Sequence, residues 1–125
     1  MERILDIAKY LTKKYKDEKK EEIDELKLHK ILYFSQKEYI MLINDFLFEE
    51  DFEGWYLGPI NKLVRKDYKF IKMGKEDISL KDIEKKIIDR VFDRYKDMDS
   101  YKLSDLSHKE YSWIKSRIGL KRVEK

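Results

Sequence analysis

Two histidines, His29 and His108, are the side chains of this sequence best suited to acid–base catalysis or metal binding near neutral pH. They lie on different expected elements, and neither stands in an HExxH motif or in a cluster with carboxylates at metal-ligand spacing. We therefore expect a structural or surface role for each histidine. The sequence contains no cysteine, which excludes thiol catalysis, cysteine-based zinc sites and disulfides.

The remaining groupings that could perform chemistry are weaker still. Gly54 and Gly58 are isolated and match neither a GxGxxG loop nor a P-loop, and no serine lies in a nucleophile elbow. One group of carboxylates could bind a cation, although a solvated turn is the simpler interpretation: Glu49, Glu50, Asp51 and Glu53. The sequence therefore predicts a protein that is not an enzyme, with no catalytic, cofactor or metal site.

A basic face is expected on the third helix of the chain. Its members recur at helical spacing, opposite an apolar stripe: Lys62, Arg65, Lys66, Lys69 and Lys72. Such a face could contact phosphates, but no helix-turn-helix, zinc-finger or glycine-aromatic RNA motif accompanies it. A solvated face is the preferred interpretation, because long lysine side chains cover apolar surface while their charges stay in water. Nucleic acid and an acidic protein surface remain alternative partners.

The composition predicts one folded domain spanning residues 1–125. Charged residues make up 44% of the chain, against about 25% in an average soluble domain, yet the net charge is only +3. Nine Tyr, six Phe and two Trp argue against disorder. No run of about 18 apolar residues could span a membrane, and the charged N-terminus does not resemble a signal peptide. We therefore expect a cytoplasmic protein with no membrane contact.

Hydrophobic periodicity predicts the elements that position these side chains. The expected fold is mainly α, a compact bundle of about five helices with a short two-stranded β insertion between the second and third helices. The expected strands lie within residues 46–56 and are joined by the acidic turn. The expected helices cover residues 2–16, 24–43, 59–72, 79–95 and 107–119.

Three of these elements carry more specific expectations. The second helix is apolar nearly all round, so we expect it to be central and buried within the monomer; the alternative is that its second face contacts another protein. Pro59 is expected at the first position of the third helix, where its missing N–H costs nothing. The charged run of residues 16–22 is expected to be an exposed loop or a frayed helix end.

The fourth helix is expected to begin at a serine cap and to bury one apolar stripe. Ser79 is the expected cap, because serine side chains accept hydrogen bonds from the free N–H groups at a helix start. The expected buried stripe consists of Leu80, Ile83, Ile87, Val91 and Tyr95.

Three segments together resemble a known family. Residues 26–36 read LKLHKILYFSQ, residues 48–60 read FEEDFEGWYLGPI, and residues 106–113 read LSHKEYSW. In order and spacing they resemble the Panacea antitoxin domain, also called the SocA-like domain and earlier known from phage-associated proteins of the GepA type. The family pattern reads roughly LKLxKLLYFxQ, DEDFEAWxxGPV and LTHxExxW. This chain departs from it modestly, with Gly54 in place of Ala and Ser107 in place of Thr.

The resemblance implies a mostly helical antitoxin that neutralises a cognate protein toxin encoded nearby, by direct protein contact. One family member instead acts as an adaptor that delivers its toxin to a protease, so a protease is a further implied partner. Some members carry an added DNA-binding domain, which we do not expect within residues 1–125. Two alternatives stay open: a phage or mobile-element protein that inhibits a host factor by binding it, and a nucleic-acid-binding module.

The expected contact residues lie in or beside the three segments. We expect a specific complex to bury on the order of 1,600 Å² and to depend on a few aromatic or arginine anchors. A residue in such a segment can equally serve packing, and Gly58 and Pro59 are expected to be structural. The candidate partner-binding residues are Glu53, Trp55, Tyr56, Lys62, Arg65 and His108. Neither the toxin nor the oligomeric state follows from the sequence.

Overall fold

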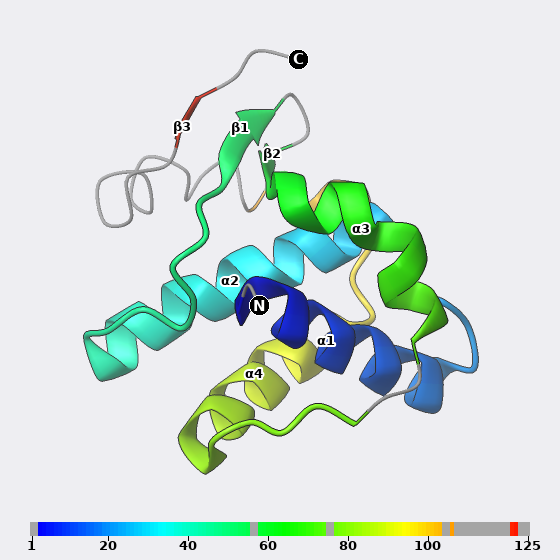
Figure 1. The fold of residues 1–125 in the computed structure, drawn as a ribbon, viewed down its shortest axis with the longest axis horizontal. Coiled ribbons are helices and arrows are strands. Elements are labelled where there is room, and N and C mark those ends of the chain that lie inside the picture. Colours follow the sequence, from blue (N-terminus) through cyan, green and yellow to red (C-terminus); the bar gives the residue numbers. More distant parts are fainter. Residues whose placement is uncertain (1–2, 56–57, 75–76, 104–105, 107–120, 123–125) are drawn as a thin grey trace.

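The computed structural model describes residues 3–55, 58–74, 77–103, 106 and 121–122 of the chain. The expected fold class is confirmed: the described part is mainly helical, with a short antiparallel strand pair between the second and third helices (Figure 1). Residues 100–103 are also helical, and the expected last helix, residues 107–119, lies outside the described residues. The elements are α1 (Arg3–Lys19), α2 (Glu25–Ile43), β1 (Glu53–Trp55), β2 (Gly58–Ile60), α3 (Lys62–Met73), α4 (Asp82–Tyr95) and β3 (Lys121–Arg122).

Helix α2 is the central element of the core. It contacts α1, α3, α4 and β2, and in Figure 1 α1 crosses in front of it while α4 lies below. The rings of Tyr15 on α1 and Phe92 on α4 meet edge to face, with centroids 6.3 Å apart. The rings of Phe34 on α2 and Tyr95 on α4 stack at 4.6 Å. Aromatic pairs of this kind add to the free energy of burying apolar surface, and here they join three helices around one core.

Helix α1 is longer than the sequence predicts. It continues through the first four residues of the charged run and ends at Lys19, because Lys and Glu are good helix formers and the buried Tyr15 anchors this turn. The chain then leaves the helix at Lys20, which has a left-handed backbone with φ 61°. The Lys20 N–H still donates to the carbonyl oxygen of Lys16, at 2.9 Å. The expected loop is therefore restricted to the residues after Lys19.

Helix α2 begins and ends at side chains suited to those positions. The carboxylate of Asp24 accepts a hydrogen bond from the Lys27 N–H and caps the start, and Asn44 ends the helix in the left-handed conformation. The expected burial holds for most residues from Lys27 to Ile40. It is wrong for the last turn, where Met41 is 63% and Leu42 52% exposed, because no other described element covers that turn.

The strand pair lies later in the chain than the sequence predicts. The expectation of strands within residues 46–56 holds for β1 but not for its partner β2, and the expected helix start at Pro59 is wrong: Gly54 of β1 pairs antiparallel with Pro59 of β2. Residues 46–52 form no strand, and the adjacent side chains of Leu47 and Phe48 are both buried in the core, whereas a strand would place them on opposite faces. Proline is tolerated in β2 because that strand lies at an edge of the sheet. At the other edge β3 pairs parallel with β1, which the sequence does not predict.

Helix α4 begins three residues after Ser79, so the expected serine cap is wrong. The Glu84 carboxylate accepts a hydrogen bond from the Lys81 N–H at 3.1 Å and takes over that role. Ile87 and Val91 are buried as expected, but Ile83 is 45% exposed. None of the helices in the described part of the chain is both long and apolar enough to cross a membrane.

Candidate functional site

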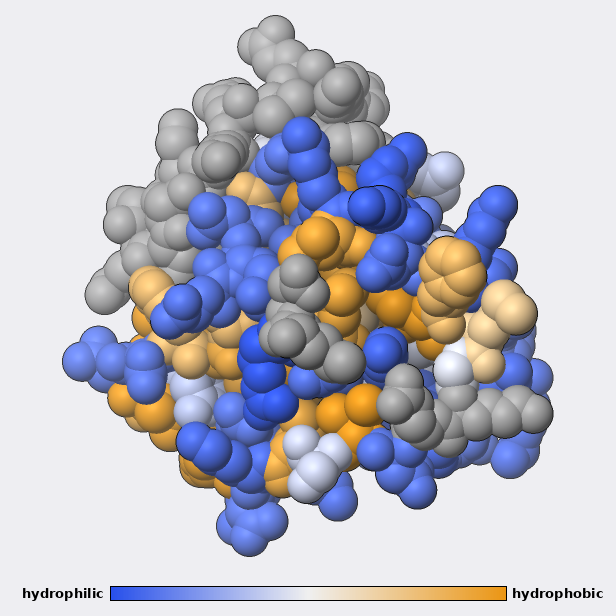
Figure 2. All heavy atoms as spheres, in the orientation of Figure 1, coloured by the Kyte–Doolittle hydropathy of each residue, from blue (hydrophilic) through white to orange (hydrophobic). Residues whose placement is uncertain are grey.

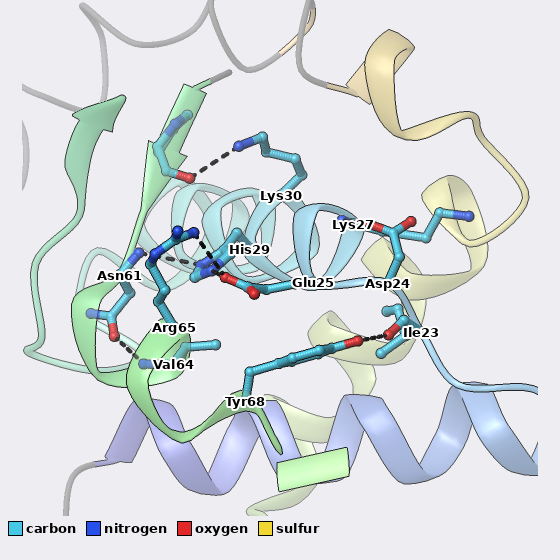
Figure 3. A network of polar contacts seen from close by, with 11 residues as sticks. Ile23, Asp24, Glu25, Lys27, His29, Lys30, Asn61, Val64, Arg65 and Tyr68 are labelled. Atoms are coloured by element: carbon cyan, nitrogen blue, oxygen red, sulfur yellow. Dashed lines mark hydrogen bonds and ion pairs between the residues drawn. The ribbon is translucent and has the colours of Figure 1, made fainter. Parts of the chain in front are cut away.

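A buried polar network joins the start of α2 to the strand pair and to α3 (Figure 3). His29 is fully buried, and its Nε2 lies 3.1 Å from Oε2 of Glu25 one turn earlier on α2. Its Nδ1 accepts a hydrogen bond from the Asn61 N–H at 3.3 Å, so the ring proton sits on Nε2 and is donated to Glu25. Burial lowers the pKa of His29 despite the neighbouring carboxylate, and the hydrogen bond from His29 lowers the pKa of Glu25. The expected structural role of His29 therefore has a geometric basis.

Lys30 is also fully buried, next to His29 on α2. Its Nζ donates a hydrogen bond to the Pro59 carbonyl oxygen at 3.2 Å. Burial lowers the pKa of Lys30 to about 7, against a smaller opposing attraction from Asp24. No carboxylate among the described residues lies within ion-pair distance of Lys30. This lysine therefore attaches β2 to α2 and exposes no charge to a partner.

Two amide side chains complete the attachment. Gln36 on α2 donates from Nε2 to the Phe48 carbonyl oxygen at 2.6 Å, and its Oε1 accepts the Leu47 N–H at 2.8 Å. Asn61 donates from Nδ2 to the Asp51 carbonyl oxygen at 2.7 Å, and its Oδ1 caps α3 by accepting the Val64 N–H at 3.0 Å. Two of the three sequence segments thus form one structural unit. Its buried polar groups are used to hold it together.

Three of the six candidate contact residues meet at the surface of this unit. Lys62, at the start of α3, pairs with Glu53 of β1, with Nζ 3.1 Å from Oε2. Arg65, on the same side of α3, reaches Oε2 of Glu25 from NH1 at 3.4 Å. Lys62 and Arg65 are exposed, whereas Glu53 is buried.

The other three candidates are only partly placed. The backbone of Trp55 lies in β1 opposite Gly58. Tyr56 and His108 lie outside the described residues. The structure therefore brings together Glu53, Lys62 and Arg65 but does not test a contact through the motif aromatics or the second histidine.

The expected acidic turn serves the fold in a way that the sequence does not reveal. Oε1 of Glu50 accepts a hydrogen bond from the Ile4 N–H at 2.9 Å, which satisfies a free donor in the first turn of α1. Carboxylates are favourable at a helix N-terminus, where the N–H groups carry partial positive charge. Within the described ranges, no group of three or more His, Asp or Glu side chains is placed to hold a metal ion.

The basic face of α3 is only partly available to an external partner. Arg65 and Lys62 are paired as above, and Lys72 pairs with Glu22 at 3.4 Å. Lys66 and Lys69 are exposed, with no carboxylate of the described residues within ion-pair distance. These pairings weaken the case for nucleic acid, because they offset much of the positive charge of the helix.

Two exposed side chains of α3, Phe70 and Met73, were missed by the sequence reasoning. The helical spacing of α3 could have predicted that they are exposed. Val64, Tyr68 and Ile71 define the inward stripe of the helix, and at a helical period Phe70 and Met73 fall on the other side.

The comparisons with known proteins give one match. The family model described as Antitoxin SocA-like, Panacea domain, matches residues 28–114, which is more than half of the chain. No curated protein and no solved structure matches. The matched residues begin within α2, run through α4 and contain most of the buried unit described above, with Glu25 lying just before the first matched residue.

Proposed function

The chain belongs to the family of SocA-like antitoxins with a Panacea domain, and on this premise we propose that it neutralises a cognate protein toxin by binding it directly. In this proposal residues 1–125 act as a single antitoxin domain in the cytoplasm, and the toxin is encoded nearby. Family membership is the observation that carries the proposal. The toxin is held by a surface and no substrate is converted, so the chain acts as a binding protein and not as an enzyme.

The geometry of the buried unit supports a role for the exterior. The polar side chains of residues 26–36 that could perform chemistry, His29 and Lys30, are buried and hydrogen-bonded to the backbone of residues 59–61. Exposed groups of the same unit lie at the start of α3, on Lys62 and Arg65. We propose that these two residues contact the toxin together with Glu53, Trp55, Tyr56 and His108.

A growth experiment tests the proposal. The neighbouring gene is expressed alone and then together with this chain, and growth is measured with co-purification of the two products. We expect arrest in the first case and, in the second, growth and a stoichiometric complex. A neighbour that neither arrests growth nor binds this chain would remove the proposal.

Charge reversal at the start of α3 tests the contact itself. Lys62→Glu combined with Arg65→Glu is expected to weaken the complex at least tenfold, because both charges face outward and repulsion replaces attraction. Lys85→Glu with Lys86→Glu makes the same change in net charge on exposed lysines of α4 and serves as the matched control. Equal affinity of the two double variants for the toxin, by calorimetry, would argue against a contact through Lys62 and Arg65.

Delivery of the toxin to a protease is a second mode of action that one observation favours. An adaptor needs two separate surfaces, and besides Phe70 and Met73 of α3 three exposed apolar side chains lie at or just after the end of α2: Met41, Leu42 and Phe46. In this mode the half-life of the toxin, followed by immunoblot after translation is blocked, shortens when this chain is present. In the occlusion mode the half-life is unchanged or longer while growth is restored.

A further inference from the structure

The outward side of α3 combines lysines with exposed apolar side chains. At a helical period five residues fall on the side opposite the buried Val64 and Ile71, and we call them the outer stripe of α3: Lys62, Lys66, Lys69, Phe70 and Met73. In the view of Figure 2 the surface over α3 shows hydrophobic residues among hydrophilic ones. This mixture differs from an ordinary solvated face, which is polar throughout.

The apolar part of the outer stripe is unusually exposed. Phe70 is 76% and Met73 72% exposed, the largest fractions among the exposed hydrophobic side chains of the described residues. The two lie one turn apart, so their side chains are neighbours on the helix surface. Aromatic and methionine side chains are enriched at the centres of protein interfaces, and methionine adapts its shape to a partner. Burial on a partner would remove both side chains from water.

The lysines of the outer stripe that lie next to its apolar side chains have no ion-pair partner among the described residues. Lys62 pairs with Glu53, whereas Lys66 and Lys69 have no carboxylate within ion-pair distance among the described residues. Lys66 precedes Phe70 by one turn, and Lys69 precedes Met73 by one turn. The positive charge is therefore centred on the apolar pair. A complementary partner presents carboxylates around an apolar depression.

The helix that carries the stripe is held firmly. Asn61 caps its start, and the Tyr68 hydroxyl donates to the Ile23 carbonyl oxygen in the segment before α2 (Figure 3). The inward side packs against α1. A surface that is already ordered loses little conformational entropy on binding, which favours affinity.

We infer that the outer stripe of α3 is the principal toxin-binding surface, and that the matching surface of the toxin is an apolar pocket or groove bordered by carboxylates. This inference rests on the proposed antitoxin function and names the chemistry of its partner. Phe70 and Met73 supply the apolar anchors, and Lys66 and Lys69 set the orientation. Nucleic acid is disfavoured as the partner because an exposed Met73 side chain contributes nothing to phosphate binding. Three cations of α3 are also already paired with carboxylates.

Calorimetry with the purified product of the neighbouring toxin gene, made inactive by mutation, tests the inference. Phe70→Ala with Met73→Ala is expected to weaken binding at least about 30-fold, as hot-spot residues do. Lys66→Glu with Lys69→Glu is expected to weaken it at least tenfold and to reduce the sensitivity of the affinity to salt. Matched controls on other surfaces are Ile83→Ala with Tyr101→Ala, and Lys85→Glu with Lys86→Glu, which should bind like the wild type.

The outcomes separate this inference from the proposed function. Thermal unfolding first confirms that each variant is folded. Stripe variants that bind the toxin as tightly as the controls would overturn the inference and leave the antitoxin function standing. A wild-type chain that fails to bind the toxin would overturn both. Stripe variants that bind toxin normally but lose affinity for a short fluorescent single-stranded RNA would identify α3 as a nucleic-acid surface and would also overturn the inference.

Discussion

Lys30 is the most unusual single residue of the described structure, because a buried ammonium group with no carboxylate partner is costly to keep charged. Among the described residues, its hydrogen-bond partner is the Pro59 carbonyl oxygen. That contact is available to the neutral amine as well as to the ammonium, which agrees with a pKa lowered to about 7 by burial. Lys30 therefore fixes the position of β2 through this hydrogen bond. Its burial lowers the free energy of unfolding at neutral pH.

The pH dependence of stability tests this view of Lys30. The pKa of Lys30 is about 7 in the folded chain and 10.5 at its ordinary value, so between these the unfolded chain binds more protons. The free energy of unfolding should rise by up to about 3 kcal/mol from about pH 7 to pH 9.5. Burial raises the pKa of Tyr10 and Tyr68, which affects stability only above about pH 10.

Substitution isolates the contribution of Lys30. Lys30→Met removes the titrating group while keeping an unbranched side chain that is one atom shorter, so the rise in the free energy of unfolding should disappear in urea titrations across this pH range. Lys86→Met, at an exposed lysine of α4, is the control and should keep the rise. The same rise in Lys30→Met as in the wild type would show that another group is responsible.

At the scale of elements, Asn61 links three parts of the molecule. Its side chain caps α3 and also donates to the Asp51 carbonyl oxygen, while its N–H donates to His29. A cap is worth about 1 kcal/mol, and a buried hydrogen bond adds a similar amount. The start of α3 and the strand pair therefore depend on the same residue.

Two substitutions separate the roles of Asn61. Asn61→Ala removes both side-chain hydrogen bonds and should lower the free energy of unfolding by about 2 kcal/mol. Asn61→Asp keeps an oxygen for the Val64 N–H and loses the donor to Asp51, so about half of that loss is expected. Urea unfolding followed by circular dichroism measures both values. Equal losses for the two variants would mean that the contact with Asp51 dominates.

The elements also show where sequence reasoning succeeds. The helices of the described part follow from apolar residues at helical spacing, and that signal is strong because each helix buries one face. The predicted helix start at Pro59 is wrong because proline is tolerated both in an edge strand and at the first position of a helix. Only the pairing of Pro59 with Gly54, which the structure shows, distinguishes the two positions. The predicted burial of Ile83 and Met41 is wrong because hydrophobic periodicity predicts which residues share a helix face but not whether another element covers that face.

The candidate site was less predictable for the same physical reason. The sequence motif marks residues 26–36, but it does not reveal that His29, Lys30 and Gln36 face inward and hold residues 47–61. Those contacts join residues far apart in the chain, so no local spacing encodes them. Lys62 and Arg65 were expected at the surface and lie there, whereas their pairing with Glu53 and Glu25 needed the structure.

At the scale of the whole molecule, ion pairs between elements use part of the high charge content. Nζ of Lys96, just after α4, lies 3.7 Å from Oε2 of Glu18 on α1. NH1 of Arg94 on α4 lies 3.4 Å from Oε1 of Glu38 on α2. Exposed pairs of this kind contribute about 0–1 kcal/mol each, so the apolar core supplies most of the stability. The outer stripe of α3 is distinguished by the combination of Lys66 and Lys69, which have no carboxylate within ion-pair distance among the described residues, with the exposed side chains of Phe70 and Met73.

We propose that this chain inactivates its toxin by occupying it and not by converting it. The most direct test titrates a fixed amount of active toxin, well above the dissociation constant, with the purified chain and measures the remaining toxin activity. We predict a linear decline that reaches zero at one equivalent and does not deepen with time. Complete inactivation by a small fraction of an equivalent, progressing with time, would show turnover and contradict the account.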